Sequence, residues 1–204
     1  MLNGVIRIGI YGGTFAPVHR GHMAAAEAFM KQMELDLLYV IPAGIPPHKQ
    51  IDAADDPRHR LRMCELAFEG MKGVIVSDME IRREGKSFTV DTLRALTGED
   101  RRLFLLMGTD MMLTLDQWRE PDEIFRLCYP IYIRRENDPV LEGQIVAKNK
   151  LYLEKYGKIA RRLVADAIEL SSTEIRDRVK SGREIDSLVP PAVAAYIQRE
   201  GLYQ

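Results

Sequence analysis

The sequence predicts an α/β protein with a doubly wound, mostly parallel sheet that is flanked by helices, and a small helical part at the C-terminal end. Two observations predict this fold class. Short apolar runs rich in β-branched residues alternate along the chain with segments whose apolar residues recur at helical spacing. A glycine-rich turn joins the first apolar run to the first helical segment. The 204 residues are enough for one domain, 1–204, in which residues 170–204 make up the helical part.

Composition narrows the class of protein. A hydrophobic content of 46% and a charged content of 29% are those of a soluble globular protein. The net charge of −1 gives no reason to expect a nucleic-acid partner, and the first apolar run is too short for a signal or membrane-spanning segment. The two cysteines, Cys64 and Cys128, lack C-x-x-C spacing and are expected to be buried thiols. These features predict a cytoplasmic protein with no membrane partner.

The first unit is predicted to be a strand, a turn and a helix. Val5–Tyr11 is short and rich in β-branched residues, which suits a buried strand. Gly12 and Gly13 break this run, and Pro17 prevents a helix from starting before the next residue. Over Arg20–Met33 the apolar residues follow a helical period. They are Met23, Ala26, Ala28, Phe29, Met30 and Met33.

The turn before this helix favours phosphate, because the first N–H groups of a helix attract anions. His19 and His22 lie three residues apart, so both imidazoles can face one side of the first helical turn. Gly21 between them leaves no side chain in the way of a ligand. One alternative is that one histidine caps the helix while the other packs inside. A metal pair is disfavoured, because no third ligand is near in sequence and a Glu base is lacking.

The second unit begins with Leu35–Ile41, which is predicted to be a buried strand. It ends in Pro42–Lys49, a loop stiffened by three prolines, and such loops at strand ends carry binding groups in α/β proteins. The alternative is a proline turn in which Lys49 is simply solvated. His48 and Lys49 are candidate binding residues because of the neighbouring phosphate motif.

A helix is then expected from Pro57, with Asp56 as its N-cap, to Gly70. Val74–Val76 is predicted to be a third strand, continued by Met79–Ile81. The arginines of this helix are expected on its solvated face: Arg58, Arg60 and Arg62.

The next helix is expected to start at Ser87 as its N-cap and to carry Val90, Leu93 and Leu96. Leu103–Met107 is predicted to be the fourth strand. Gly108-Thr109-Asp110 follows it, and a carboxylate in this place suits hydrogen bonds from sugar hydroxyls. Trp118, the only tryptophan, lies in a polar loop, where its ring either packs or stacks on a planar base.

The chain continues with a short helix closed by Ile124–Leu127 and a fifth strand, Cys128–Ile133. Arg134-Arg135 follows; one of these arginines is a candidate phosphate contact, and the alternative is a charged loop. Asp138–Arg162 is lysine-rich and helix-like. It is interpreted as a surface helix or a contact in a homo-oligomer, not as a nucleic-acid patch.

A second anion site is predicted near the C-terminal end. Ile168–Leu170 is expected to be a short strand, and Ser171 with Glu174 forms a capping box at the helix that follows. The first turn of this helix presents two hydroxyls and a guanidinium, those of Ser172, Thr173 and Arg176. A final amphipathic helix, with Val193, Tyr196, Ile197 and Leu202 on its apolar side, is expected to pack on the core. The whole arrangement is Rossmann-like.

The motifs resemble those of a known family. Gly12–His22, a glycine-rich loop followed by His-x-Gly-His, is similar to the nucleotidyltransferase signature. Three later stretches narrow the resemblance to the bacterial nicotinate-nucleotide (nicotinic acid mononucleotide) adenylyltransferases: the Pro-Pro-His-Lys of Pro46–Lys49, the Gly-x-Asp of Gly108–Asp110 followed by a tryptophan, and the Ser-Ser-Thr-x-Ile-Arg of Ser171–Arg176.

The resemblance spans nearly the whole chain and is weakest over residues 138–164. Two positions depart from the family pattern. The family usually has a polar residue, most often Asp, where this chain has Ala16, so that contact must be missing or replaced. The family often has Asn near Ala43.

The resemblance implies roles for individual residues. His19 and His22 would act on the α-phosphate and the leaving oxygens of ATP. Asp110 would bind a ribose. Trp118 would lie against the nicotinate ring, and the backbone around Thr89 would receive the nicotinate carboxylate. The implied ATP-binding residues are Gly12, Gly13, Thr14, Phe15, Gly21, Gly108, Asp110, Ser172, Thr173 and Arg176. The implied mononucleotide-binding residues are His48, Lys49, Thr89, Trp118, Arg119 and Arg135.

The implied reaction joins ATP and nicotinate mononucleotide to give the deamido dinucleotide and pyrophosphate, with Mg²⁺ bridging phosphates and no metal site made by protein side chains alone. Four alternatives stay open. The acceptor could be phosphopantetheine, against which Trp118 and Pro46–Lys49 argue, or nicotinamide mononucleotide. The chain could be a nucleotide sensor without catalysis, for which Ala16 is the only hint. An aminoacyl-tRNA synthetase fragment is disfavoured, because the chain is short and has no lysine-serine-lysine loop.

Overall fold

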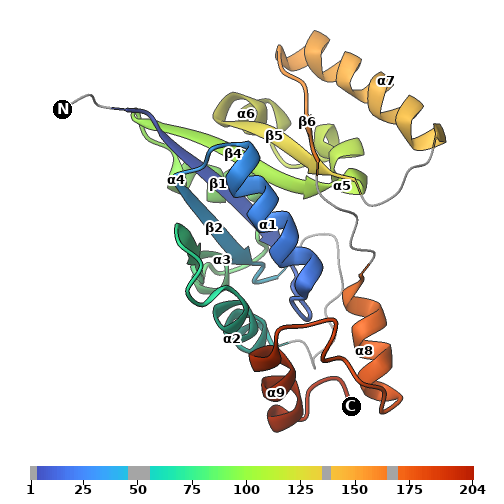
Figure 1. The fold of residues 1–204 in the computed structure, drawn as a ribbon. Coiled ribbons are helices and arrows are strands. Elements are labelled where there is room, and N and C mark those ends of the chain that lie inside the picture. The colour runs from blue at the N-terminus through green and yellow to red at the C-terminus, as the bar shows by residue number, and fades with distance from the viewer. Residues whose placement is uncertain (1–3, 46–55, 135–138, 165–169) are drawn as a thin grey trace.

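A six-stranded parallel sheet organises the protein (Figure 1). The computed structural model describes residues 4–45, 56–134, 139–164 and 170–204. The strand order is β3-β2-β1-β4-β5-β6, and every neighbouring pair is parallel. The strands are β1 (Ile6–Gly13), β2 (Leu37–Pro42), β3 (Val74–Val76), β4 (Arg101–Gly108), β5 (Cys128–Ile133) and β6 (Arg161–Leu163). The order reverses between β1 and β4, so the expected switch point lies there.

Helices cover both faces of the sheet, which confirms the doubly wound α/β fold (Figure 1). One core cluster joins the sheet to α1 (Arg20–Gln32), α2 (Pro57–Phe68), α8 (Ser172–Lys180) and α9 (Pro191–Glu200). The other joins it to α4 (Thr89–Leu96), α5 (Thr109–Leu113), η1 (Leu115–Gln117), α6 (Pro121–Leu127) and α7 (Pro139–Tyr156). A short helix, α3 (Met79–Arg82), follows β3. The helices α8 and α9 form the expected C-terminal helical part.

Strand β4 shows why the predicted strands are continuous apolar runs. Phe104 and Leu106 belong to the first core cluster, whereas Leu103, Leu105 and Met107 belong to the second. Successive side chains point to opposite faces, and both faces are covered by helices, so every residue in this run is buried.

Three local predictions are wrong. Met79–Ile81 does not extend β3 but lies in the helix α3, because the neighbouring strand β2 ends at Pro42, which has no N–H for a further strand pair. Ser87 is not the N-cap of α4, since Phe88 takes that place and the Ser87 hydroxyl accepts a hydrogen bond from the Gly44 N–H at 3.1 Å. Arg60 is not on a solvated face, because its side chain is fully buried.

The C-terminal third differs from the prediction in two further ways. Arg161–Leu163 is not the end of a helix but the edge strand β6, in which only Leu163 is buried. Helix α7 is not a purely surface helix, because Ile145 and Tyr152 are buried in the second core cluster. The strand predicted at 168–170 lies mostly outside the described residues, and Leu170 itself is not in a strand.

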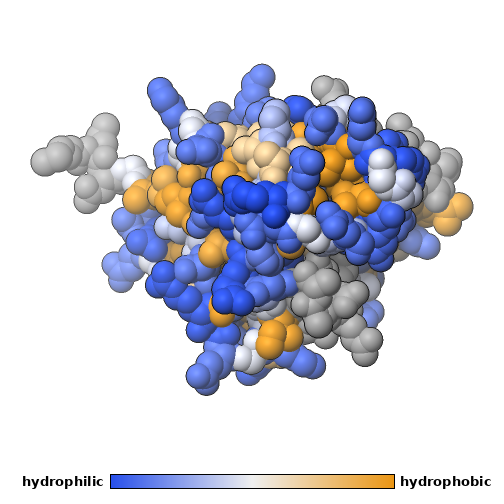
Figure 2. All heavy atoms as spheres, turned by 90° about the horizontal axis from the view of Figure 1, so that it is seen from below, coloured by the Kyte–Doolittle hydropathy of each residue, from blue (hydrophilic) through white to orange (hydrophobic). Residues whose placement is uncertain are grey.

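Among the described residues, no helix has both the length and the apolar composition that a membrane span requires. Figure 2 views the molecule from the end at which α8 and α9 lie in Figure 1. It shows a face that is mainly hydrophilic, with smaller hydrophobic areas between the polar side chains.

The two cysteines are buried, as expected. Cys64 and Cys128 are both 0% exposed, and burial raises the pKa of both thiols, that of Cys128 to about 12. Because the thiolate is the reactive form, we expect neither to react with Ellman's reagent in the folded protein at about pH 8. Both should react within minutes in about 6 M guanidinium chloride. Rapid labelling of the folded protein would contradict the buried positions.

Candidate active site

A cavity of about 760 Å³ opens at the carboxyl ends of β1 and β4, the switch point of the sheet. Most of the predicted site residues line it: Gly12, Gly13, Thr14, Phe15, His19, His22, Thr89, Gly108, Asp110, Trp118, Arg119, Ser172, Thr173 and Arg176. Gly21 lies in the first turn of α1 but not in the cavity wall. His48, Lys49 and Arg135 lie outside the described residues.

The turn after β1 brings the first motif to the cavity. Phe15 has a positive φ of 51°, a conformation that is uncommon for a residue with a side chain. Its ring is held edge-on by two neighbours, with the Tyr11 centroid at 5.3 Å and the His22 centroid at 5.0 Å. Packing therefore keeps the turn in a conformation that a free peptide would rarely adopt.

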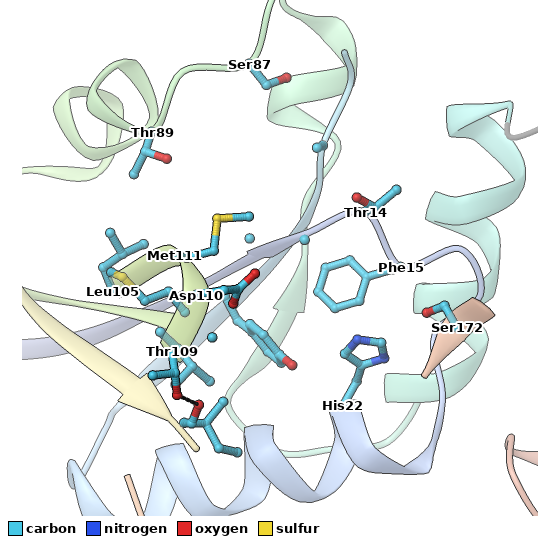
Figure 3. A pocket seen from close by; sticks show the side chains of 18 of the residues that line it. Thr14, Phe15, His22, Ser87, Thr89, Leu105, Thr109, Asp110, Met111 and Ser172 are labelled. Carbon is cyan, nitrogen blue, oxygen red and sulfur yellow. Dashed lines mark hydrogen bonds between the residues drawn. The ribbon is translucent and has the colours of Figure 1, made fainter. Parts of the chain in front are cut away.

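The two histidines have different places at the start of α1. His19 is the N-cap residue and is 2% exposed. Its N–H donates to Nδ1 of His22 at 3.2 Å, and the two rings are stacked with centroids 3.7 Å apart. Because Nδ1 of His22 accepts a hydrogen bond, its Nε2 carries the proton of the neutral ring and can donate to an anion. His22 points toward Phe15 in the cavity (Figure 3). His19 thus occupies the N-cap position, as the capping alternative expected, and both histidines line the cavity, whereas their role toward an anion stays a prediction.

The second motif meets the first. Ser171 caps α8, with its Oγ accepting from the Glu174 N–H at 3.1 Å. The Ser172 hydroxyl donates to the Pro17 carbonyl at 2.9 Å, and Nη1 of Arg176 donates to the Ala16 carbonyl at 2.8 Å. Two segments far apart in sequence thus form one wall of the cavity, as the two anion motifs predicted.

These contacts also define the surroundings of Ala16. Its side chain lines the cavity and is 3% exposed, and a methyl group offers no hydrogen bond. What this position supplies instead is its backbone carbonyl, which Arg176 binds. The guanidinium also donates from Nη2 to Oγ1 of Thr173 at 3.2 Å, so its plane is fixed at the cavity wall.

The opposite end of the cavity is formed by α4 and the segment after β4. Thr89 begins α4, and Asp110 lies between Thr89 and His22 in the close view (Figure 3). A Cβ atom on Gly108 would come within 2.6 Å of Oδ1 of Asp110. Any larger residue at position 108 would therefore crowd the Asp110 carboxylate in its present position. The Arg119 guanidinium lies 4.6 Å from the centroid of Phe88, the N-cap of α4.

Helix α7 packs against the segment that follows β4 and hydrogen-bonds to it. Lys148 donates to both carboxylate oxygens of Asp116 at 2.7 and 2.9 Å, and the Tyr152 hydroxyl donates to the Met112 carbonyl at 2.6 Å. Burial alone would raise the pKa of Asp116, but the hydrogen bond and charge of Lys148 outweigh it and lower that pKa. Met112 in α5 and Asp116 in η1 both lie between Asp110 and Trp118 in the sequence. The helix therefore fixes the wall of the cavity that carries these two residues.

Glu80 is a cavity residue that the sequence pattern does not reveal, because the pattern of Met79–Ile81 predicts a strand rather than a cavity wall. It is 8% exposed and its carboxylate accepts from Oγ1 of Thr92 at 2.7 Å. Burial raises the pKa of the Glu80 carboxyl, and the opposing effects of Thr92, Arg83 and Ser87 are smaller. Because burial favours the neutral form of a carboxyl, the Glu80 side chain is protonated more readily than an exposed glutamate.

The raised pKa of Glu80 predicts how stability depends on pH. The stability that this group contributes is fully present below the unfolded-state pKa of about 4.3, and is lost as pH rises through the higher folded-state value. Glu80→Gln keeps an acceptor for Thr92 without the charge. It should be more stable than the parent protein at about pH 8 in urea unfolding, and equal to it near about pH 4. The matched control is Glu184→Gln at an exposed position. A Glu80→Gln protein that is less stable at about pH 8 would contradict the burial effect.

Known proteins share both the sequence and the fold. A model of the cytidylyltransferase-like family matches residues 10–178. A protein of Thermoanaerobacter sp. (strain X514), named probable nicotinate-nucleotide adenylyltransferase, is 36% identical and covers 98% of this chain and 95% of its own length. A protein of the same name from Synechococcus sp. (strain JA-3-3Ab) is 40% identical, over 97% of this chain and 94% of its own.

The fold is also that of a solved structure. The structure of Plasmodium falciparum nicotinic acid mononucleotide adenylyltransferase complexed with NaAD has a TM-score of 0.75 at 18% identity and covers 97% of both chains. At this identity the likeness concerns the fold alone, whereas the curated relatives extend it to the sequence over nearly the full length of both chains. The chain belongs to the cytidylyltransferase-like family and, within it, to the nicotinate-nucleotide adenylyltransferases.

Proposed function

We propose that this protein transfers the adenylyl group of ATP to nicotinate mononucleotide, giving the deamido dinucleotide and pyrophosphate in NAD biosynthesis. The names of the relatives support this activity. The observation that carries it is the contact between the two anion motifs, in which Ser172 and Arg176 bind the carbonyls of Pro17 and Ala16. One cavity thereby joins a histidine pair and a helix start, which suits a chain of phosphates.

The reaction needs little covalent help from the protein. An oxygen of the mononucleotide phosphate attacks the α-phosphorus of ATP and forms a new P–O bond. The bond from that phosphorus to the bridging oxygen breaks, and its electron pair leaves with pyrophosphate. The attacking phosphate has a second pKa of about 6 and is largely ionised at neutral pH, so no general base is required. Alignment and charge neutralisation remain as the tasks of the site.

We assign the two anion motifs to different parts of ATP. Nε2–H of His22 serves the α-phosphate, where negative charge shifts during the reaction. The N–H groups at the start of α8 and the remaining donors of Arg176 serve the departing pyrophosphate. The Ser172 hydroxyl is committed to the Pro17 carbonyl, so its part is to hold the turn rather than to donate to a phosphate.

We assign the other end of the cavity to the mononucleotide. The first turn of α4 at Thr89 would receive the nicotinate carboxylate, which favours the acid over the neutral amide. Trp118 would stack on the pyridine ring and Arg119 would bind the mononucleotide. Asp110 would accept hydrogen bonds from a ribose of ATP.

Magnesium is proposed to enter with ATP. Among the described residues, no group of three or more histidine, cysteine, aspartate or glutamate side chains is placed to hold a metal ion. Magnesium keeps several waters and binds through substrate phosphates in many nucleotide sites, so we propose that the triphosphate and water supply most of its ligands. When bound, the ion would neutralise charge on the triphosphate.

The test is pyrophosphate release from ATP with a panel of acceptors. We expect release with nicotinate mononucleotide, a lower kcat/KM with nicotinamide mononucleotide, and none with phosphopantetheine or without an acceptor. Preference for phosphopantetheine would identify a different adenylyltransferase. ATP binding without turnover on any acceptor would identify a sensor. Either result would contradict the proposal.

A further inference from the structure

Arg60 differs from the other arginines of α2. Its side chain is 0% exposed, whereas Arg58 and Arg62 are both exposed and pair with acidic residues on their own segment. The guanidinium of Arg60 reaches out of the helix to backbone carbonyls. Nη1 donates to the carbonyl of Thr14 at 2.8 Å, and Nη2 donates to those of Ala43 at 2.6 Å and Gly44 at 3.2 Å.

These carbonyls belong to the turns after two adjacent strands. Thr14 follows β1 in the turn that leads to the histidine pair, and Ala43 and Gly44 follow β2. Thr14 and Ala43 line the cavity but Arg60 does not, so the guanidinium lies behind the turns. In a trans peptide the C=O and N–H groups point in opposite directions. Binding of the Thr14 carbonyl therefore turns the Phe15 N–H away from Arg60, on the side of the turn that faces the cavity.

The second turn is held from two sides. In the peptide between Ala43 and Gly44, the carbonyl binds Arg60 and the N–H donates to Oγ of Ser87 at 3.1 Å. The Ser87 N–H in turn donates to the Ile45 carbonyl at 2.9 Å. A Cβ atom on Gly44 would come within 2.4 Å of the Glu80 carbonyl, so only glycine fits between these segments. Ser87 lies two residues before Thr89, so the contacts run from the first turn to the start of α4.

We propose that Arg60 is a positioning residue that locks the turn proposed to bind ATP to the loops proposed to bind the mononucleotide, and so sets the separation of the two reacting phosphates. This inference rests on the proposed function for the identity of the two substrates. Arg60 touches neither of them. It acts through the carbonyls of Thr14, Ala43 and Gly44, which only a planar fork of several donors can bind together.

The test compares Arg60→Lys with the matched control Arg62→Met on the same helix. Lysine keeps the charge but cannot bind three carbonyls in the geometry of a guanidinium. We expect Arg60→Lys to bind each substrate alone within about threefold of the parent protein and to lose about 10- to 100-fold in kcat, because misplacement of reacting groups lowers turnover. Arg62→Met should be unchanged in both. Arg60→Met would extend the series if it folds.

Two results would overturn the proposal. The first is an unchanged kcat in an Arg60→Lys protein whose circular dichroism spectrum shows that it is fully folded. This result would mean that Arg60 has only a structural role. A rise in both KM values at unchanged kcat would make it a binding residue instead.

Hydrogen exchange of the protein without ligands separates failure of this inference from failure of the proposed function. Arg60→Lys should exchange faster than the parent protein both at residues 12–16 and at residues 86–89, whereas Arg62→Met should not. This result does not depend on any turnover. Faster exchange at residues 12–16 alone would show that the two loops are not locked together, even in an enzyme with the proposed activity.

Discussion

Replacing His22 with alanine is expected to lower kcat by about 10²- to 10³-fold while the affinity for the mononucleotide stays nearly unchanged. Nδ1 of His22 accepts from the His19 N–H, which leaves Nε2–H as a donor fixed at the cavity wall. A donor in a fixed position stabilises charge that develops in the transition state more than charge already present in the ground state. The loss should therefore appear in kcat rather than in mononucleotide binding, measured by pyrophosphate release and by titration of the mononucleotide.

The matched control is His59→Ala. Nδ1 of His59 lies 2.8 Å from the Tyr196 hydroxyl, and this histidine is not part of the cavity wall. Its replacement removes this contact and should lower the thermal stability of the protein without changing kcat of the folded enzyme. A His22→Ala enzyme with normal turnover would refute the assignment of His22 to the α-phosphate, and with it the proposed role of the first motif.

Replacing Arg176 with alanine is expected to lower kcat/KM for ATP by about 10²-fold or more. The substitution removes a guanidinium from the proposed pyrophosphate site and also removes the donor that binds the Ala16 carbonyl. Both losses act on ATP and its leaving group, because the turn at Ala16 leads to the histidine pair. Titration with ATP in the absence of an acceptor should show weaker binding, while the affinity for the mononucleotide changes little.

Arg178→Ala on the same helix is the control for this substitution. Arg178 forms an ion pair with Glu174 at 3.0 Å and does not line the cavity. Equal effects of the two substitutions would mean that Arg176 contributes only general positive charge or helix stability. A large loss that is confined to Arg176 would support the proposed pyrophosphate site.

The parts of the fold that local physics determines could be predicted from the sequence. Val5–Tyr11 has the length and β-branching of a buried strand, and the apolar period over Arg20–Met33 is that of a helix with one buried face. The structure places β1 and α1 within two residues of these bounds. The two proposed anion motifs could be found because each combines a helix start with polar side chains at fixed spacing, and residues of both line the same cavity.

Errors arose where the partner of a residue is distant in sequence. Arg60 has the spacing of a solvated arginine, because the carbonyls of Thr14, Ala43 and Gly44 that bury it come from other turns. Ser87 has the spacing of an N-cap, but its hydroxyl is used by Gly44. No local pattern could reveal either contact, since hydrogen bonds between turns depend on the completed sheet.

The edge strand β6 could not be predicted from the sequence for a different reason. A strand at the edge of a sheet has one neighbour and can be polar, so Arg161 and Arg162 gave no apolar run to recognise. Helix α7 was recognisable as a helix but not as a buried one, because its apolar residues are spread around its circumference and only Ile145, Tyr152 and their neighbours face the core.

The hydrogen bonds between α7 and the segment from Asp110 to Trp118 affect how the protein responds to heat. Lys148 and Tyr152 tie the outer helix to η1 and α5, so the helix and this part of the cavity are expected to open together as one cooperative unit. Fraying of α7 on warming would therefore weaken ligand capture before the sheet melts. Adaptation of this enzyme to a new growth temperature should accordingly select substitutions in α7, remote from the reacting atoms.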